Sequence, residues 1–143
     1  MMVERSLIAV VDDDESVRES LPDLLREFGF AAQAFASAEE FLASGCIGQA
    51  HCLILDIAMP GMSGRDLQHE LQQHWQAVPI VFITAHADDV LRPSVLENGA
   101  VECLRKPFSD IALLRAIQAA LGASLIPPGV PTFGARNDTS QRG

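Results

Sequence analysis

The sequence predicts a doubly wound α/β fold, in which a five-stranded parallel sheet is covered by five helices on its two faces. Short apolar runs alternate with helical patterns through most of the chain, and this alternation is typical of an open parallel sheet. Acidic residues directly follow two of the apolar runs, at the place where ligands bind in such sheets. The length of 143 residues fits one domain that can bury a core without disulfides or a structural metal.

The first unit consists of a strand at residues 6–11 and a helix that ends at Gly29. Pro22 lies inside this helix, and because the apolar pattern continues beyond it, we expect a kink rather than a break. The apolar face of the helix is formed by Val17, Leu21, Leu24, Leu25 and Phe28.

The second and third units follow the same plan. A strand from Ala31 to Phe35 precedes Ser37 and Glu40, whose spacing is that of a capping box and predicts the start of a short helix through Phe41 and Leu42. A strand at residues 52–55 precedes a third helix. Ser63 or a neighbour begins that helix, which buries Leu67, Leu71 and Trp75.

The last two units complete the sheet. A strand at residues 79–84 is followed by a helical pattern that ends at Asn98, and Pro93 inside this pattern predicts a delayed start or a kink. A strand at residues 101–104 precedes a fifth helix from about Ser109 to Gly122. Its apolar positions are Ile111, Leu114, Ile117 and Leu121.

These elements place one domain at residues 1–122. Residues 123–143 are rich in proline, glycine and small polar residues and have no periodicity, so we expect a linker or a disordered tail there. No second core is visible in the sequence. Any output module is therefore expected outside this chain.

Composition excludes several classes of protein. The formal net charge of -9 and the absence of a basic stripe argue against direct nucleic-acid binding. No apolar run is long enough to cross a membrane and no signal peptide is apparent, so we expect a cytoplasmic protein that does not bind membranes. Cys46, Cys52 and Cys103 have no metal-like spacing and are interpreted as ordinary buried thiols.

Polar residues fall where four of the predicted strands end. Asp12, Asp13 and Asp14 follow the first strand, and Asp56 follows the third. Crowded carboxylates repel one another unless a cation lies among them, and Mg²⁺ prefers such oxygen ligands. A hydroxyl and an ammonium at the ends of the last two strands, from Thr84 and Lys106, complete the groups needed to receive a phosphoryl group.

The segments VVDDDE, LDIAMPGMSG, ITAH and LRKPF occur in this order, each at the end of a predicted strand. With them the chain resembles the receiver domain of two-component response regulators over residues 6 to about 121, and most resembles the branch whose receivers precede a helix-turn-helix module. The resemblance implies a flavodoxin-like three-layer sandwich with strand order 2-1-3-4-5.

The resemblance also implies roles for individual residues. Asp56 would be the phosphoacceptor. Asp13, Asp56 and the backbone carbonyl of Ala58 would bind Mg²⁺ directly, and Asp12 would act through a metal-bound water. Thr84 and Lys106 would contact the phosphoryl group, and the bond between Lys106 and Pro107 would be cis, as X-Pro bonds can be at small cost.

Two departures from the family concern signal output. Cys103 stands where receivers usually carry an aromatic switch residue, and Pro93 lies in a helix of the usual output face. The partners implied are a sensor histidine kinase or phosphotransfer protein, and a second copy through the face of helix four, strand five and helix five. The domain would regulate transcription through an output module. It would not be an enzyme, although Mg²⁺-dependent phosphorylation from small donors and self-dephosphorylation are expected.

Other interpretations remain open from the residues alone. Asp14 is interpreted mainly as a helix cap. An aspartate-nucleophile phosphatase would use Asp12 and Asp14 but would give Asp56 no role. A phosphorylation-independent scaffold would not need the set of Asp13, Asp56, Thr84 and Lys106.

Overall fold

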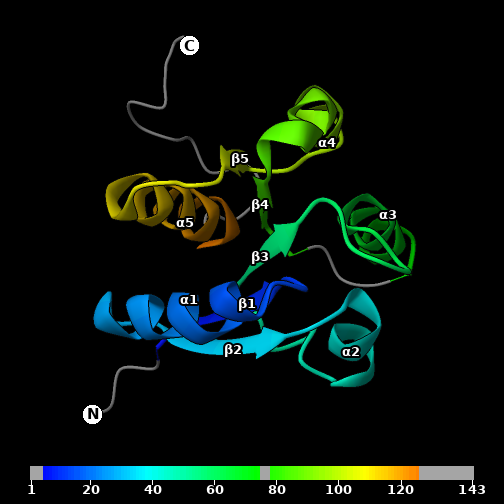
Figure 1. The fold of residues 1–143 in the computed structure, drawn as a ribbon. Helices are drawn as coiled ribbons and strands as arrows, with labels where there is room; N and C mark the ends of the chain where they lie inside the picture. Colours follow the sequence, from blue (N-terminus) through cyan, green and yellow to red (C-terminus); the bar gives the residue numbers. More distant parts are fainter. Residues whose placement is uncertain (1–4, 75–77, 126–143) are drawn as a thin grey trace, which may run out of the picture.

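In the computed structural model, residues 5–74 and 78–125 are described and form a single α/β sandwich (Figure 1). All five strands lie parallel in the order β2-β1-β3-β4-β5, which confirms the predicted topology. The strands are β1 (Leu7–Val11), β2 (Ala31–Phe35), β3 (Cys52–Asp56), β4 (Ile80–Thr84) and β5 (Glu102–Arg105). Every residue of β3 and β4 is buried, as expected for central strands that are covered on both faces.

The helices divide between the two faces of the sheet (Figure 1). They are α1 (Glu15–Glu27), α2 (Ala38–Ala43), α3 (Gly64–His74), α4 (Arg92–Glu97) and α5 (Asp110–Leu125). Leu21 and Leu25 of α1 share a core cluster with the buried face of α5. The opposite cluster contains Phe41 of α2, Leu67 of α3 and Val95 of α4. The sandwich therefore has two separate apolar cores, one on each side of the sheet.

Capping hydrogen bonds confirm the predicted starts of α2 and α3. Ser37 accepts a hydrogen bond from the Glu40 backbone N–H, and Glu40 in turn accepts one from Ala36 N–H. Ser63 and Asp66 make the equivalent reciprocal pair before α3, at 3.1 Å each. Both pairs satisfy backbone donors that the first turn of a helix leaves free.

Two proline effects are visible. Helix α1 continues through Pro22 without the break that was excluded, and the kink expected there stays a prediction. The chain after β4 forms a 3₁₀ helix, η1 (His86–Leu91), before α4 begins at Arg92 with Pro93 in its first turn. The missing amide of a proline is tolerated there because first-turn amides have no partner within the helix. The delayed start predicted from Pro93 is therefore confirmed.

The prediction for the fifth helix was right for Ile117, which is buried, and for Leu121, which packs against the same core, but wrong for Ile111 and for the end of the helix. Ile111 is 63% exposed, and the side chains that pack against the sheet are Leu113, Ala116, Ile117 and Ala120. Small alanines let α5 lie close to the strands, and a search for large apolar residues overlooks them. The helix also continues past Gly122 to Leu125, because a glycine inside a helix weakens it without ending it.

One further prediction is off by a residue, and others concern residues that the structure does not describe. Strand β5 is displaced by one residue from the predicted 101–104. Trp75 and residues 126–143 of the predicted tail lie outside the described part of the chain. Among residues 5–74 and 78–125, no helix combines the length and apolarity needed to cross a bilayer.

Candidate functional site

The register of the sheet brings the acidic residues together. Val11 pairs with Leu55 across β1 and β3, so the residues that follow, Asp12 and Asp56, meet at the carboxyl edge of the sheet. The Asp12 backbone N–H donates to Phe35 O of β2 at 3.1 Å, which fixes the chain just after β1. Oxygens of Asp12, Asp13 and Asp56 all lie within 4.8 Å of one another. The predicted convergence of these three carboxylates is thus present.

The three carboxylates differ in their contact with solvent. Asp12 is fully buried, Asp56 is 6% exposed, and Asp13 is exposed. Asp14 lies outside the cluster and caps α1, where its carboxylate accepts from Ser16 N–H at 3.0 Å and from the Ser16 hydroxyl at 2.8 Å. These bonds hold the pKa of Asp14 below its usual value. The interpretation of Asp14 as a helix cap is confirmed.

Asp12 is held on three sides. Its Oδ1 accepts the Asp14 backbone N–H at 2.9 Å, and its backbone carbonyl accepts from Nη1 of Arg18 at 3.0 Å. Its Oδ2 lies 3.0 Å from Nζ of Lys106. Apart from that ion pair, Oδ2 has no hydrogen-bond donor within the described residues. A buried carboxylate oxygen so poorly satisfied is suited to a further cationic or water partner.

Lys106 is positioned by the strand beside it. Its backbone N–H donates to the carbonyl of Thr84 at 2.8 Å, and the peptide bond to Pro107 is cis, the isomer that the resemblance implies. Burial by itself lowers the pKa of Lys106, but the hydrogen bond to Asp12 and the charges of Asp56, Asp12 and Asp14 outweigh it and raise the pKa. The ammonium therefore stays charged beside the carboxylates.

The carboxyl group of Asp56 has a strongly raised pKa. Burial first, and then the charge of Asp12, raise the pKa of Asp56 from 3.8 to about 7, although Lys106 and a hydrogen bond from the Ala58 backbone oppose the shift. A carboxylate at this position is costly to ionise without nearby positive charge. Such a group, in reach of solvent and beside an ammonium, is a candidate nucleophile.

Thr84 ends β4 and is fully buried. Its hydroxyl donates to the carbonyl of Ala85 at 3.0 Å, so it is engaged with the backbone of the following residue. Ala58 is exposed in the loop directly after β3. Both residues therefore lie at the same edge of the sheet as the carboxylates.

The carboxylates fit a divalent cation. Three carboxylates whose oxygens lie within one small volume are the donor set that Mg²⁺ prefers, and the buried Oδ2 of Asp12 has Lys106 as its partner among the described residues. Lys106 neutralises only part of this charge. The acidic group therefore has the composition of a magnesium site.

Two residues near this site were not found from the sequence. Arg18 of α1 donates to the backbone carbonyl of Asp12, and the separation of six residues between them matches no local contact pattern. Glu39 of α2 accepts a hydrogen bond from Met62 N–H in the loop after β3, at 3.0 Å. No local pattern indicates that contact, because it depends on how α2 packs beside the loop.

The space beside Cys103 is open. Cys103 is buried, and a hollow of about 450 Å³ next to it is lined by Arg92, Cys103, Leu104, Arg105, Pro107, Phe108 and Ala112. Arg92 crosses from α4 to β5, where its Nε donates to the carbonyl of Cys103 at 3.1 Å and its guanidinium lies 3.4 Å from Glu102. The start of α4 is thus tied to β5 by a charged side chain.

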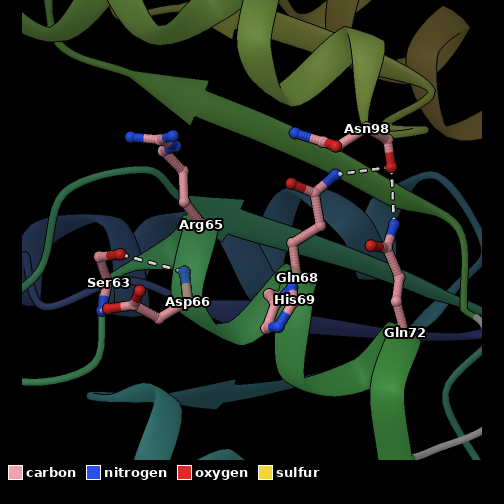
Figure 2. A pocket seen from close by; sticks show the side chains of 7 residues that line it. All are labelled: Ser63, Arg65, Asp66, Gln68, His69, Gln72 and Asn98. Atoms are coloured by element: carbon pink, nitrogen blue, oxygen red, sulfur yellow. Dashed lines mark hydrogen bonds between the residues drawn. The ribbon is translucent and has the colours of Figure 1, made fainter.

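A second hollow, of about 300 Å³, lies between α3 and the end of α4 and contains none of the clustered carboxylates (Figure 2). Figure 2 shows Gln68 and Gln72 directing their amides to the carbonyl of Asn98, at 3.4 and 2.6 Å. Gln68 also donates to the carbonyl of Val95 at 3.2 Å. These bonds satisfy carbonyls that α4 leaves free at its end. They therefore join α4 to α3.

Comparisons with known proteins agree with this geometry. The model of the family described as the response regulator receiver domain matches residues 8–118. The response regulator protein TodT of Pseudomonas putida is 41% identical over 116 residues, which cover 81% of this chain and 51% of TodT. The transcriptional regulatory protein FixJ of Azorhizobium caulinodans is 38% identical over 123 residues, which cover 86% of this chain and 58% of FixJ.

A solved structure gives the same result. The response regulator StyR matches with a TM-score of 0.78 and 46% identity, over 84% of this chain and 61% of the StyR chain. The chain spans about half the length of the curated relatives it matches, since 116 residues cover 51% of TodT.

Proposed function

This chain belongs to the receiver domains of two-component response regulators, and from that membership we propose that it is a phosphorylation-controlled switch whose phosphoacceptor is Asp56. A receiver is a signalling domain rather than a classical enzyme. The observation that supports the role of Asp56 most strongly is its burial among Asp12, Asp13 and Lys106 at the carboxyl edge of the sheet. The donor we propose is a sensor histidine kinase or a phosphotransfer protein.

The proposed reaction moves one phosphoryl group. An oxygen of the Asp56 carboxylate attacks phosphorus, the bond between phosphorus and the donor nitrogen breaks, and the donor histidine keeps the electron pair and takes a proton. Because burial raises the pKa of Asp56 to about 7, the carboxylate must be stabilised in its charged form at the moment of attack. Lys106 is placed to provide part of that charge, and Thr84 has a hydroxyl that can turn from the Ala85 carbonyl to a phosphoryl oxygen.

The residues that would hold Mg²⁺ are Asp13, Asp56 and the backbone carbonyl of Ala58 directly, with Asp12 through a water molecule. When bound, Mg²⁺ supplies the positive charge that lets two anions approach each other. Asp12 and Asp13 orient this end of the site, and Arg18 and the Phe35 carbonyl hold the backbone on which they lie.

We base the proposed output of this domain, regulation of transcription, on its relatives. FixJ is a transcriptional regulatory protein, and this chain covers 58% of it. We therefore assign this chain to a cytoplasmic regulator of transcription that acts through a helix-turn-helix module outside these 143 residues. The face of α4, β5 and α5 is the proposed surface for a second copy.

Phosphorylation from a small donor tests the proposal. With Mg²⁺ and acetyl phosphate, intact-protein mass spectrometry should find one added phosphoryl group on the wild-type chain. Chelation of the metal should prevent the addition, and so should Asp56→Asn. Undiminished phosphorylation of Asp56→Asn would contradict the assignment.

A further inference from the structure

The loop after β3, residues 57–63, carries Ala58 and joins Asp56 to α3. Two of its side chains, Ile57 and Met59, are buried in the core beneath α2 and α3. These apolar anchors fix the first half of the loop. In the second half, Met62 packs against the same core with a partly buried side chain, and polar contacts fix the rest of the backbone.

Gly64 closes the loop at its far end. Its backbone N–H donates to the carbonyl of Ile57 at 2.8 Å. A Cβ at this position would overlap the carbonyl oxygen of Asp56, so only glycine lets the start of α3 come this close to the proposed phosphoacceptor. The loop thus begins and ends against the backbone of the same two residues, Asp56 and Ile57.

Glu39 holds the middle of the second half. Its Oε2 accepts from Met62 N–H at 3.0 Å, across a separation of 23 residues in sequence. The preceding residue, Gly61, has a φ of +74°, and a Cβ there would lie 2.8 Å from the same oxygen. The glycine therefore provides both the backbone conformation and the space that this hydrogen bond needs.

We infer that Glu39 is a positioning residue for the metal end of the site: through Met62 it fixes the loop that carries Ala58, and so sets the affinity for Mg²⁺. The inference rests on the proposed function. Glu39 is exposed and belongs to the first turn of α2, so it can be replaced without opening either core. It contacts neither the carboxylate cluster nor the phosphoacceptor through any bond that the described residues show.

A simpler role for Glu39 is that its charge favours the start of α2. Glu40 provides the matched control, because it is also acidic, exposed and in the first turn of α2. Glu40 also accepts a backbone N–H, that of Ala36 at 2.9 Å, but this bond stays within the cap of α2. A helix-start role predicts similar effects of the two residues, whereas positioning predicts an effect on the metal for Glu39 alone.

The test measures Mg²⁺ binding by isothermal titration calorimetry on the full chain. Glu39→Ala should weaken Mg²⁺ binding by about three- to tenfold, the size expected for loss of one ordinary hydrogen bond. Glu39→Gln should stay within about twofold of the wild type, because an amide oxygen accepts the same hydrogen bond. Glu40→Ala should lower the melting temperature and leave Mg²⁺ affinity unchanged.

Two further measurements separate the hydrogen bond from other effects. Without metal, the Met62 amide should exchange with solvent faster in Glu39→Ala than in the wild type or Glu39→Gln. Gly61→Ala should weaken Mg²⁺ binding at least as much as Glu39→Ala, because its Cβ displaces the same carboxylate and its φ of +74° strains an alanine. The double variant should be no weaker than the worse single variant.

The outcomes distinguish this inference from the proposed function. Mg²⁺ binding by the wild type that is lost in Asp13→Asn supports the metal site independently of Glu39. If that holds and Glu39→Ala binds Mg²⁺ as the wild type does, the positioning role is overturned alone. A Gln variant as weak as the Ala variant would also overturn it, because charge would then be the cause. No Mg²⁺ binding by the wild type would overturn both.

Discussion

Asp56 is buried, yet the role proposed for it needs a negatively charged carboxylate, and its neighbours explain how the two can be combined. The carboxylate lies beside Asp12, which raises the pKa of Asp56, and within the field of Lys106, which lowers it. Burial raises the pKa of Asp56 by more than the ammonium of Lys106 lowers it. In the metal-free protein, the charged form of Asp56 is therefore unfavourable and lowers the free energy of unfolding.

The pH dependence of stability follows from the raised pKa of Asp56. The folded chain keeps a proton that the unfolded chain loses near pH 3.8, so the free energy of unfolding should fall as the pH rises from about 4 to about 7. The difference in pKa corresponds to on the order of 4 kcal/mol. Urea denaturation of the metal-free protein at several pH values measures it. Asp56→Asn should show a flatter profile, and equal slopes for the two proteins would contradict the raised pKa.

Substitution of Asp13 offers the simplest test of metal binding, because Asp13 is the exposed member of the cluster. In the metal-free protein, Asp13→Asn should raise the melting temperature by removing one of the crowded charges. Mg²⁺ at about 100 times its dissociation constant should stabilise the wild type by about 2.7 kcal/mol if the unfolded chain does not bind it. The variant should lose that increment, and equal Mg²⁺ shifts in both proteins would exclude Asp13 as a ligand.

Most residues of the candidate site could be predicted from the sequence, for a physical reason. Asp56 and Thr84 end their strands and Asp12 and Lys106 directly follow theirs, and parallel strands bring such ends to one edge. Glu39 could not be predicted in this way. Its bond to Met62 depends on the packing of α2 beside a loop 23 residues further along the chain, and no periodicity encodes that approach.

At the scale of elements, helix starts were predictable because capping is local, whereas the buried face of α5 was not. Ser37 and Ser63 bond within three residues of themselves, so their roles can be found in a short stretch of sequence. The buried face of α5 depends on packing against the whole sheet. Ala116 and Ala120 lie on this face because small side chains let the helix pack close to the strands. Helices α3 and α4 are likewise joined by a contact between elements, the amide of Gln68.

Gln68 should contribute to stability through the end of α4. Its side chain is buried and donates to the carbonyls of Val95 and Asn98. Gln68→Met keeps a similar shape but removes the donor, so we expect a loss of about 1–3 kcal/mol in the free energy of unfolding. Gln72→Met is the control: it is exposed, water can replace its bond to Asn98, and the loss should stay below about 1 kcal/mol. Equal losses would show that burial of Gln68 does not matter.

Phosphorylation should remodel the segment of residues 85–92 more than β5. This segment follows Thr84, is 3₁₀ rather than α-helical, and is followed at once by Pro93. Cys103 has little volume to swing in the adjoining space, so β5 should change little. Hydrogen exchange of the phosphorylated and free chains measures both segments. A change concentrated in residues 101–105 would contradict this account, and Cys103→Tyr should increase the change there.

At the scale of the whole molecule, the order of the strands accounts for the site. Placing β1 and β3 side by side at the centre brings the carboxylates after them together, and β4 and β5 then add Thr84 and Lys106 from the same edge. The two cores hold the sheet from both faces and leave this edge free for loops. The same arrangement would also suit an aspartate-nucleophile phosphatase, except for the state of Asp12. That residue is buried and paired with Lys106, whereas Asp56 retains some exposure.

Identification of the phosphorylated residue tests the central claim most directly. The chain is treated with Mg²⁺ and acetyl phosphate, the acyl phosphate is reduced with borohydride to mark its position, and the peptides are sequenced by mass spectrometry. The account predicts one marked residue, Asp56, with the mark absent when the metal is chelated. A mark on Asp12, or on any residue other than Asp56, would contradict it.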